Sequence, residues 1–410
     1  MALLQVLRPT LPILIGASVM LTLSMGLRQS LGIFMQPLTR DIGISVSDFT
    51  LAVAVQNLAW GFLQPVAGAL TVRHGFRTIM VIGSLFYCAG LVLLATAHGM
   101  ISVTIGGGVL IGASLACTAT GIGMSVTTRA VPESVRSTVL GIVSAAGSLG
   151  ALVSAPLGQM LMDGFGWRAG LAGFVVLSLL MLPASWYAGR VDKIPLPKPS
   201  ANELGAVSPF TVVKTAYSNM SFVVMSIAFM VCGMQLVFLT THLPSYLTIC
   251  GMDPMLSAQT LGMIGGFNVL GSLFFGWAGQ RWNKLALLGL IYVLRSLTLA
   301  WYFMLPPTPG STLLFGAIMG FLWLGVSPLA AGAVAEMFGI RWQAMIQGLS
   351  FMVHQLGSFL GAFGGGLLYD TLGSYDMAWR LGVALGLTGG IVQITFALIR
   401  PSRPPELRAA

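Results

Sequence analysis

The amino-acid sequence predicts an all-α membrane protein with twelve transmembrane helices in two pseudo-symmetric six-helix bundles. Composition is the first reason. Hydrophobic residues make up 56% of the 410-residue chain and charged residues only 8%, against roughly 25% charge in soluble domains. Length is the second reason, because about twenty apolar residues cross a bilayer and the chain therefore has room for about twelve spans with short loops.

An internal repeat is the third reason, and it predicts that the helices form two bundles. A shift of 207 residues places Gly141 on Gly348, Leu149 on Leu356, Gly150 on Gly357, Ala155 on Ala362, Gly158 on Gly365 and Asp163 on Asp370. A Trp-Arg pair closes both copies, as Trp167-Arg168 and Trp379-Arg380. A repeat of about half the chain length is typical of two similar bundles lying side by side.

Apolar stretches place six spans in the first half, residues 1–189. The first, near 12–36, is too long for the apolar region of a signal peptide, so we interpret it as an uncleaved span. The other five are expected near 46–70, 77–97, 101–128, 138–162 and 168–189.

A polar segment, residues 190–219, separates the two halves. It carries Pro195, Pro197 and Pro199 and three lysines, and we interpret it as a cytoplasmic linker. Six more spans follow and form the second bundle, residues 220–410. They are expected near 220–247, 255–279, 285–305, 312–335, 344–369 and 378–399.

Basic residues are distributed unevenly between alternate loops. With both termini placed inside, three of the 20 basic residues lie outside, Arg40, Arg168 and Arg380. Fifteen lie inside: Arg8, Arg73, Arg77, Arg129, Arg136, Arg190, Lys193, Lys198, Lys214, Arg281, Lys284, Arg341, Arg400, Arg403 and Arg408. Because cytoplasmic loops of membrane proteins carry the excess of positive charge, we expect cytoplasmic termini and a multi-pass protein of the cell (inner) membrane.

The two remaining basic residues, Arg28 and Arg295, lie within predicted spans, whereas all 11 acidic residues fall in loops or at span ends. An intramembrane arginine costs about 2.5–3.5 kcal/mol on insertion scales, so such residues usually face a cavity and mark the path of an ion or substrate. Arg28 is therefore predicted to bind substrate, with structural pairing to backbone carbonyls as the alternative. For Arg295, midway along the ninth span, substrate binding and hydrogen bonding to backbone carbonyls of a neighbouring helix are equal alternatives.

Uncharged polar side chains within the spans are further candidate substrate contacts. His354 and Gln355 lie near the middle of the eleventh span, where His354 either takes part in function or is a hydrogen-bonded structural histidine. Asn57, Gln235 and Asn268 either line a cavity or make interhelical hydrogen bonds of about 0.6 kcal/mol each.

Other classes of function lack their sequence signatures. The four cysteines have no paired metal spacing, and glycine runs such as Gly106-Gly107-Gly108 are not followed by a P-loop lysine. We therefore expect no enzyme, no metal site and no cofactor. Basic residues are not interleaved with aromatic ones, so the expected surroundings are lipid and not nucleic acid. We expect a monomer.

The loop after the second span resembles a signature of the major facilitator superfamily. Gly68-Ala-Leu-Thr-Val-Arg73-His-Gly75-Phe-Arg77 follows the pattern of Gly, three residues, Asp, Arg, one residue, Gly and basic residues, with Val72 in place of Asp. In the second half Gln280 replaces the Asp and Arg281 is kept. In that family the motif latches the two halves together. The resemblance thus implies gating roles for Gly68, Arg73, Gly75, Arg77 and Arg281, with a weaker latch.

Two further stretches extend the resemblance. Gly147-Ser-Leu-Gly150 to Ala155-Pro156-Leu-Gly158 is similar to the family's fifth-helix glycine pattern, which ends in Gly-Pro, and adds Pro156 to the conformational residues. Gly26-Leu-Arg28-Gln-Ser30-Leu-Gly32-Ile-Phe34 resembles the first span of the monocarboxylate transporter and oxalate/formate exchanger branch. The eighth-span arginine of that branch, expected near Asn268 and Ser272, is absent here.

The resemblance implies a secondary active transporter in which two bundles rock about a mid-membrane site, with 190–219 as a tether. The expected substrate is a small organic anion, most simply a carboxylate, carried by proton symport or by antiport. His354, His242 or the substrate itself would carry the proton. The alternatives are a drug or sugar-type exporter of the same superfamily and a membrane sensor that transports nothing.

Overall fold

The computed structural model describes residues 5, 7–196 and 207–399, and these residues form helices without a strand. Lys198, Arg400, Arg403 and Arg408, which the sequence analysis places on the cytoplasmic side, lie outside the described residues. The helices of the first half are η1 (Arg8–Thr10), α2 (Leu11–Ser30), η2 (Leu31–Phe34), α3 (Met35–Ile42), α4 (Val46–Ala95), α5 (Met100–Val103), η3 (Thr104–Leu110), α6 (Ile111–Thr118), α7 (Thr120–Ala130), α8 (Glu133–Phe165), α9 (Trp167–Leu179), α10 (Met181–Ala188) and η4 (Gly189–Lys193).

The second half follows the same plan. Its helices are α11 (Pro209–Ser218), α12 (Met220–Ile249), α13 (Pro254–Arg281), α14 (Lys284–Met304), α15 (Pro309–Phe321), α16 (Val326–Phe338), α17 (Gln343–Phe359), η5 (Leu360–Gly364), α18 (Gly365–Leu372) and α19 (Asp376–Ile399).

Eleven stretches of the described residues are long and apolar enough to cross a membrane. One of them, Asp48–Ala95, has 48 residues, about 72 Å of helix at 1.5 Å per residue and more than twice the hydrocarbon thickness. Gly75 interrupts it with φ 81° and ψ 159°, a conformation that favours glycine. Division at Gly75 gives twelve crossings. The sequence predicts a loop between residues 70 and 77, whereas the backbone there stays helical except at Gly75.

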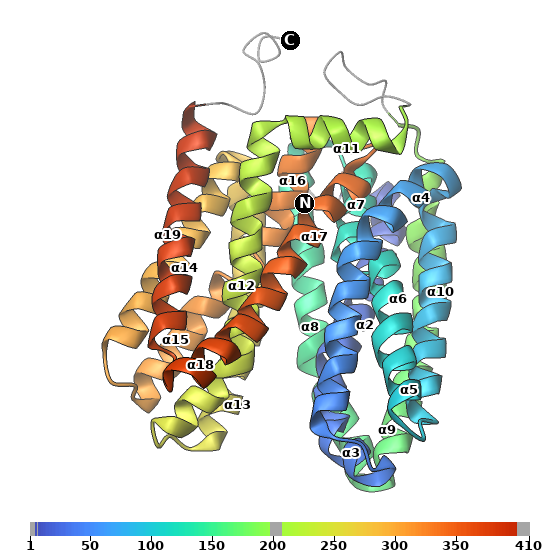
Figure 1. Ribbon diagram of the computed structural model, residues 1–410. Coiled ribbons are helices and arrows are strands. Elements are labelled where there is room, and N and C mark those ends of the chain that lie inside the picture. The colour runs from blue at the N-terminus through green and yellow to red at the C-terminus, as the bar shows by residue number, and fades with distance from the viewer. Residues whose placement is uncertain (1–4, 6, 197–206, 400–410) are drawn as a thin grey trace.

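The two halves form separate bundles that meet at one end of the molecule. Figure 1 shows α2 to α10 in one bundle and α12 to α19 in the other. The short helix α11 lies across one end, which we call the α11 face, and the bundles diverge toward the end that carries α3 and α18. The segment expected as a linker therefore contains helix: Ser208 caps α11 by accepting a hydrogen bond from the Thr211 N–H, and Pro209 occupies its first turn.

The repeated glycines make the same helix contact in both bundles. A Cβ atom on Gly150 of α8 would collide with the Thr22 carbonyl of α2, and one on Gly357 of α17 would collide with the Met230 carbonyl of α12. Two helices can approach this closely only through residues without side chains. The internal repeat thus corresponds to a structural pseudo-symmetry.

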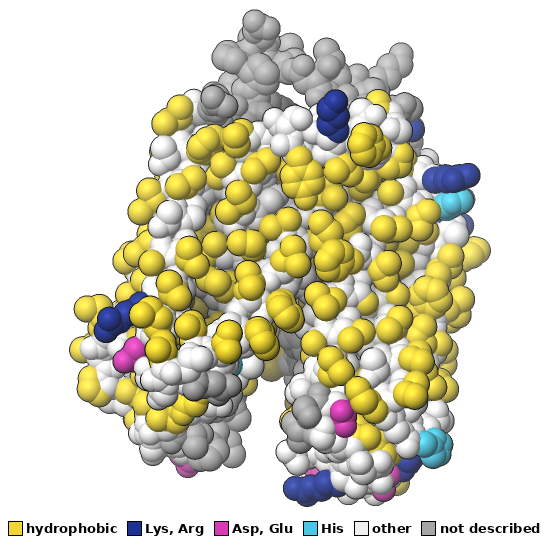
Figure 2. Space-filling view, in the orientation of Figure 1, with side chains coloured by type: hydrophobic (Ala, Val, Ile, Leu, Met, Phe, Trp, Pro, Cys, Tyr) yellow, Lys and Arg dark blue, Asp and Glu magenta, His cyan; other side chains and the backbone are white. Residues whose placement is uncertain are grey.

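The outer surface of the bundles suits lipid. In Figure 2 hydrophobic side chains cover the middle of the molecule, while the visible Lys, Arg, Asp and Glu side chains lie toward its two ends. Large apolar side chains are exposed on this surface, among them Val153, Val176, Phe363 and Ile391. In water such an apolar surface would drive aggregation, whereas hydrocarbon solvates it.

Candidate functional site

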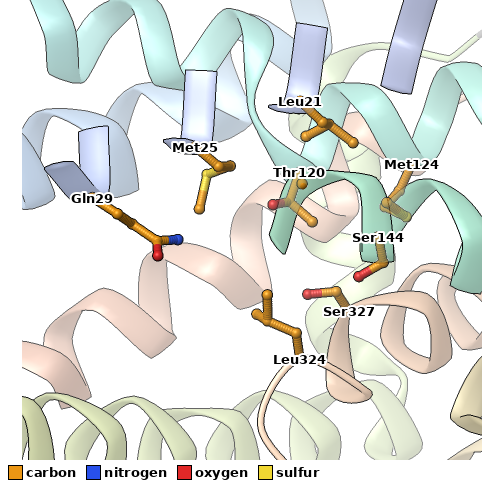
Figure 3. A pocket seen from close by; sticks show the side chains of 9 residues that line it. Leu21, Met25, Gln29, Thr120, Met124, Ser144, Leu324 and Ser327 are labelled. Atoms are coloured by element: carbon orange, nitrogen blue, oxygen red, sulfur yellow. The ribbon is translucent and has the colours of Figure 1, made fainter. Parts of the chain in front are cut away.

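A cleft separates the bundles at the end away from α11, as the space-filling view shows (Figure 2). Between the bundles lies a small pocket with about 290 Å³ of empty space, part of it open to solvent, lined by Leu21, Met25, Gln29, Thr120, Met124, Ser144, Gly147, Leu324 and Ser327. The first seven belong to the first bundle and the last two to the second. Figure 3 shows the hydroxyl groups of Ser144 and Ser327 directed into the same space.

The pocket borders two interrupted helices. The fourth span is broken at Ala119, where φ is −83° and ψ −161°, between α6 and α7. The tenth span is broken at 322–325, between α15 and α16. Thr120 begins α7, and Leu324 and Ser327 lie at or just after the second break. Broken helices at the repeat interface are typical of transporter substrate sites, because their backbone groups are free to bind.

Arg295 stabilises the interrupted backbone between α15 and α16. Its side chain is fully buried. Nε and Nη2 donate to the Leu322 carbonyl at 2.9 and 2.6 Å, Nη2 also donates to the Trp323 carbonyl at 2.5 Å, and Nη1 lies 2.9 Å from the Cys232 sulfur. These carbonyls have lost their helical partners, so the guanidinium satisfies groups that would otherwise be costly to bury.

Asn268, which lies in α13, stabilises the same interrupted backbone. Its Oδ1 atom accepts a hydrogen bond of 2.8 Å from the Leu324 N–H. Gln235 lies elsewhere, within the second bundle, where its Nε2 donates to Ser296 Oγ and to the Gly382 carbonyl. Of the seven predicted substrate contacts, Asn268, Gln235 and Arg295 thus make hydrogen bonds inside the second bundle.

Arg28 lies in the last turn of α2, against α4. Its Nε donates to Gln56 Oε1 at 3.2 Å and its Nη2 to Asn57 Oδ1 at 2.5 Å, and the guanidinium carbon lies 4.9 Å from the ring centroid of Trp60. The side chain remains partly exposed. Among the described residues, Nη1 has no hydrogen-bond partner, so one edge of the guanidinium is available to a ligand.

A chain of polar contacts joins Arg28 to the second bundle. Gln355 Nε2 of α17 donates to the Asn57 carbonyl at 3.1 Å. Gln355 Oε1 in turn lies 3.3 Å from Nδ1 of His354, whose ring stacks on Phe351 with centroids 5.5 Å apart. Four predicted site residues, Arg28, Asn57, His354 and Gln355, are therefore brought together across the bundle interface.

The glycines of the predicted gating set lie where helices meet. Gly68 packs against the α17 backbone, since a Cβ there would collide with Met345 N. Next to Gly75, the Asp192 carboxylate accepts hydrogen bonds of 2.9 Å from the N–H groups of Phe76 and Arg77. This carboxylate comes from η4 and caps the helix that restarts after the break.

The arginines and the proline of the predicted gating set lie nearer the protein surface. Arg77 lies over the ring of Trp186 at 4.4 Å and Arg281 over Trp277 at 4.2 Å. Arg73 is exposed, and so is Pro156, which lies inside α8.

Sequence reasoning missed the polar lining of the pocket, Gln29, Thr120, Ser144 and Ser327. A weak signal exists for one of them, because Gln29 follows Leu21 and Met25 at intervals of four residues and so shares their helix face. Serine and threonine are common in membrane helices and give no comparable signal. Within the described residues, no three His, Cys, Asp or Glu side chains gather as a metal site would require.

Comparison with known proteins agrees with this architecture. Residues 17–362 match the family model of the Major Facilitator Superfamily. Human "Monocarboxylate transporter 11" is 27% identical, over 93% of this chain and 82% of its own length. Rat "Monocarboxylate transporter 13" is 24% identical, over 87% and 82%. The "Uncharacterized MFS-type transporter YcxA" of Bacillus subtilis is 22% identical, over 85% of each chain.

Solved structures give the same fold. The Escherichia coli fucose:proton symporter FucP superposes with a TM-score of 0.71 at 14% identity, over 93% of this chain and 98% of that one. The proton:xylose symporter XylE superposes with a TM-score of 0.69 at 12% identity, over 95% of each chain. Because the family model covers most of the sequence and the helices adopt the matching fold, the chain belongs to the Major Facilitator Superfamily and is a membrane transporter, not an enzyme.

Proposed function

We propose that this transporter carries a small organic anion, most simply a monocarboxylate, and binds it at Arg28. The observation that supports this proposal is the geometry of Arg28. Gln56 and Asn57 hold one edge of its guanidinium, while the edge formed by Nη1 and Nη2 keeps donors for a carboxylate. Arginine binds carboxylates through two parallel hydrogen bonds, which supply both energy and orientation. The names of the monocarboxylate transporter relatives support the same substrate class.

The two bundles would expose this site alternately to the two sides of the membrane. The gap at the end away from α11 supports assignment of this state as outward-facing, with the α11 face on the cytoplasmic side. One solved structure of similar fold, with a TM-score of 0.70, is FucP in the outward conformation. In the rocking motion, the hydrogen bond from Gln355 to the Asn57 carbonyl would break when the two bundles separate near these residues.

Transport by the purified protein in proteoliposomes tests the proposal. Counterflow against a panel of mono- and dicarboxylates should identify the substrate. Arg28→Ala should then lower its affinity roughly 10- to 150-fold, because hydrogen bonds to charged groups contribute about 1.5–3 kcal/mol. Arg28→Lys should retain part of the affinity, since it keeps the charge but loses the planar fork.

Arg40→Ala is the matched control, because Arg40 is an exposed arginine in α3. It should transport as the unchanged protein does. Normal affinity in a well-expressed Arg28→Ala protein would place the anion elsewhere. Absence of counterflow for every carboxylate would favour a different substrate class.

A further inference from the structure

A second pocket lies on the α11 face, at the junction of the two halves. It encloses about 620 Å³ of empty space, part of it open to solvent, and is lined by Thr71, Val72, Gly75, Phe76, Arg129, Asp192, Leu196, Ile340 and Arg341. Five of these residues come from the first half, Asp192 and Leu196 come from the segment that follows it, and Ile340 and Arg341 come from the second half. A ligand here would therefore contact both halves at once.

The pocket has an excess of positive charge. Its one carboxylate, Asp192, is occupied by the N–H groups of Phe76 and Arg77, and its oxygen lies 4.0 Å from Arg129 Nη1, beyond hydrogen-bond distance. Arg129 Nη2 donates to the carbonyls of Asp192 and Ile194. The pocket lining thus holds two arginines and one carboxylate, and that carboxylate is already engaged.

Arg341 has no partner in the part of the chain that the structure describes. Its Nε atom is enclosed without a hydrogen bond, as is Nε of Arg129. The two guanidinium groups are near enough to act on one another as like charges. Arg341 also stands two residues before α17, whose first turn holds no acidic residue. The partial positive charge of that helix end adds to the field of the two arginines.

We infer that this pocket binds a small oxyanion of the phosphate or carboxylate type between Arg129 and Arg341, and that the bound anion holds the α11 face closed. The oxyanion supplies acceptor oxygens to guanidinium donors that lack them and neutralises the mutual repulsion of the arginines. Because the ligand would join Arg129 of the first half to Arg341 of the second, its binding favours the state described here over the state open at the α11 face. The inference does not depend on which substrate is transported.

Thermal unfolding of the full-length protein in detergent, without added lipid, tests the site with inorganic phosphate at constant ionic strength. Millimolar phosphate should raise the Tm, because a ligand that binds only the folded state stabilises it. Arg341→Gln should lose most of this increase. Lys214→Gln, which removes one positive charge from exposed helix α11 without touching the pocket, should keep it.

Val72→Asp is the second variant, because it places a tethered carboxylate in the pocket. It should raise the Tm without phosphate and abolish the further rise with phosphate.

Measurements in nanodiscs identify the natural source of the anion. If phosphatidic acid reproduces the phosphate effect, and Arg341→Gln removes it, a lipid headgroup fills the site; if only free phosphate does so, a soluble anion fills it. An equal phosphate effect in Arg341→Gln and in the unchanged protein, or no effect of either anion on the latter, would overturn the inference.

Discussion

Arg28 and Arg295 are the same side chain in the same apolar surroundings, yet their partners differ. Arg28 contacts two side-chain amides and keeps one edge of its guanidinium open, whereas Arg295 is fully enclosed and bonds backbone carbonyls. Burial of an arginine costs several kcal/mol unless its donors are satisfied. We therefore propose that Arg295 positions the break at 322–325 and that Arg28 meets the substrate.

Replacement of Arg295 tests this difference. Arg295→Met has similar bulk but no donors, so the carbonyls of Leu322 and Trp323 should lose their hydrogen bonds at about 1–3 kcal/mol for each buried group. The Tm in detergent should fall, and the affinity for substrate should fall with it because Leu324 and Ser327 would shift. Arg295→Lys should recover part of both. Arg380→Met, an exposed control, should change neither; an unchanged Tm in Arg295→Met would refute the positioning role.

His354 is the residue at which proton coupling can be tested. It lies beside Gln355 in the polar chain to Arg28, and all acidic residues of the sequence fall in loops or at span ends. We expect uptake that follows a pH gradient and ignores the membrane potential, because a monoanion moving with one proton is electroneutral. His354→Gln should weaken the dependence on pH if this residue carries the proton.

Proteoliposomes with an imposed pH gradient, and separately with a potassium diffusion potential, distinguish the coupling modes. The potential acts with about 2.3 kcal/mol per charge per 100 mV on any net charge that moves. Uptake driven by the potential alone would exclude electroneutral proton symport. Uptake that requires an internal anion and ignores the pH gradient would indicate exchange.

At the scale of helices, glycine contacts determine how closely the bundles meet near the α11 face. Gly141 of α8 and Gly276 of α13 pack backbone to backbone, and a Cβ on Gly276 would lie 2.5 Å from Gly141 Cα. On the other side of the interface, Gly68 and Gly348 make similar contacts between α4 and α17. Because nothing can be inserted at these points without separating the helices, they hold this end of the interface together.

Gly276→Leu should therefore favour the state that is open at the α11 face. Overpacking costs about 1–3 kcal/mol, which corresponds to a shift of roughly 5- to 150-fold in a two-state equilibrium. Spin labels at Asp163 and Thr371, on exposed positions of the two bundles, should show a shorter distance as the opposite end closes. Gly266→Leu in the same helix is the control, since nothing lies within 4 Å of its added Cβ. Equal distance distributions in the two variants would contradict the role of this contact.

At the scale of the whole molecule, the prediction concerns orientation in the membrane. If the α11 face is cytoplasmic, a single cysteine at Asp163 in a Cys-free variant should react with an impermeant thiol reagent in intact cells. One at Lys193 should react only after the membrane is opened. Both positions are exposed in the structure, so access and not burial decides the result. Labelling of Lys193→Cys in intact cells would reverse the assigned orientation.

The class of fold and part of the candidate site follow from the amino-acid sequence without coordinates. Mean hydropathy of +0.89 and the repeat around Gly150 and Gly357 were sufficient for twelve helices in two bundles, because hydrocarbon requires apolar residues wherever the chain crosses it. The cost of a buried charge likewise selected Arg28 and Arg295 without any coordinates.

What these residues contact depends on how the helices pack. The carbonyls that bind Arg295 exist because a helix is interrupted at 322–325, and an apolar run of sequence does not reveal such an interruption. Gln355 meets Asn57, and Arg341 shares a pocket with Arg129, because helices from different halves pack together. Hydropathy is a property of each segment alone, whereas a binding site is made by side chains far apart in the sequence, so its partners are fixed only when the bundles pack.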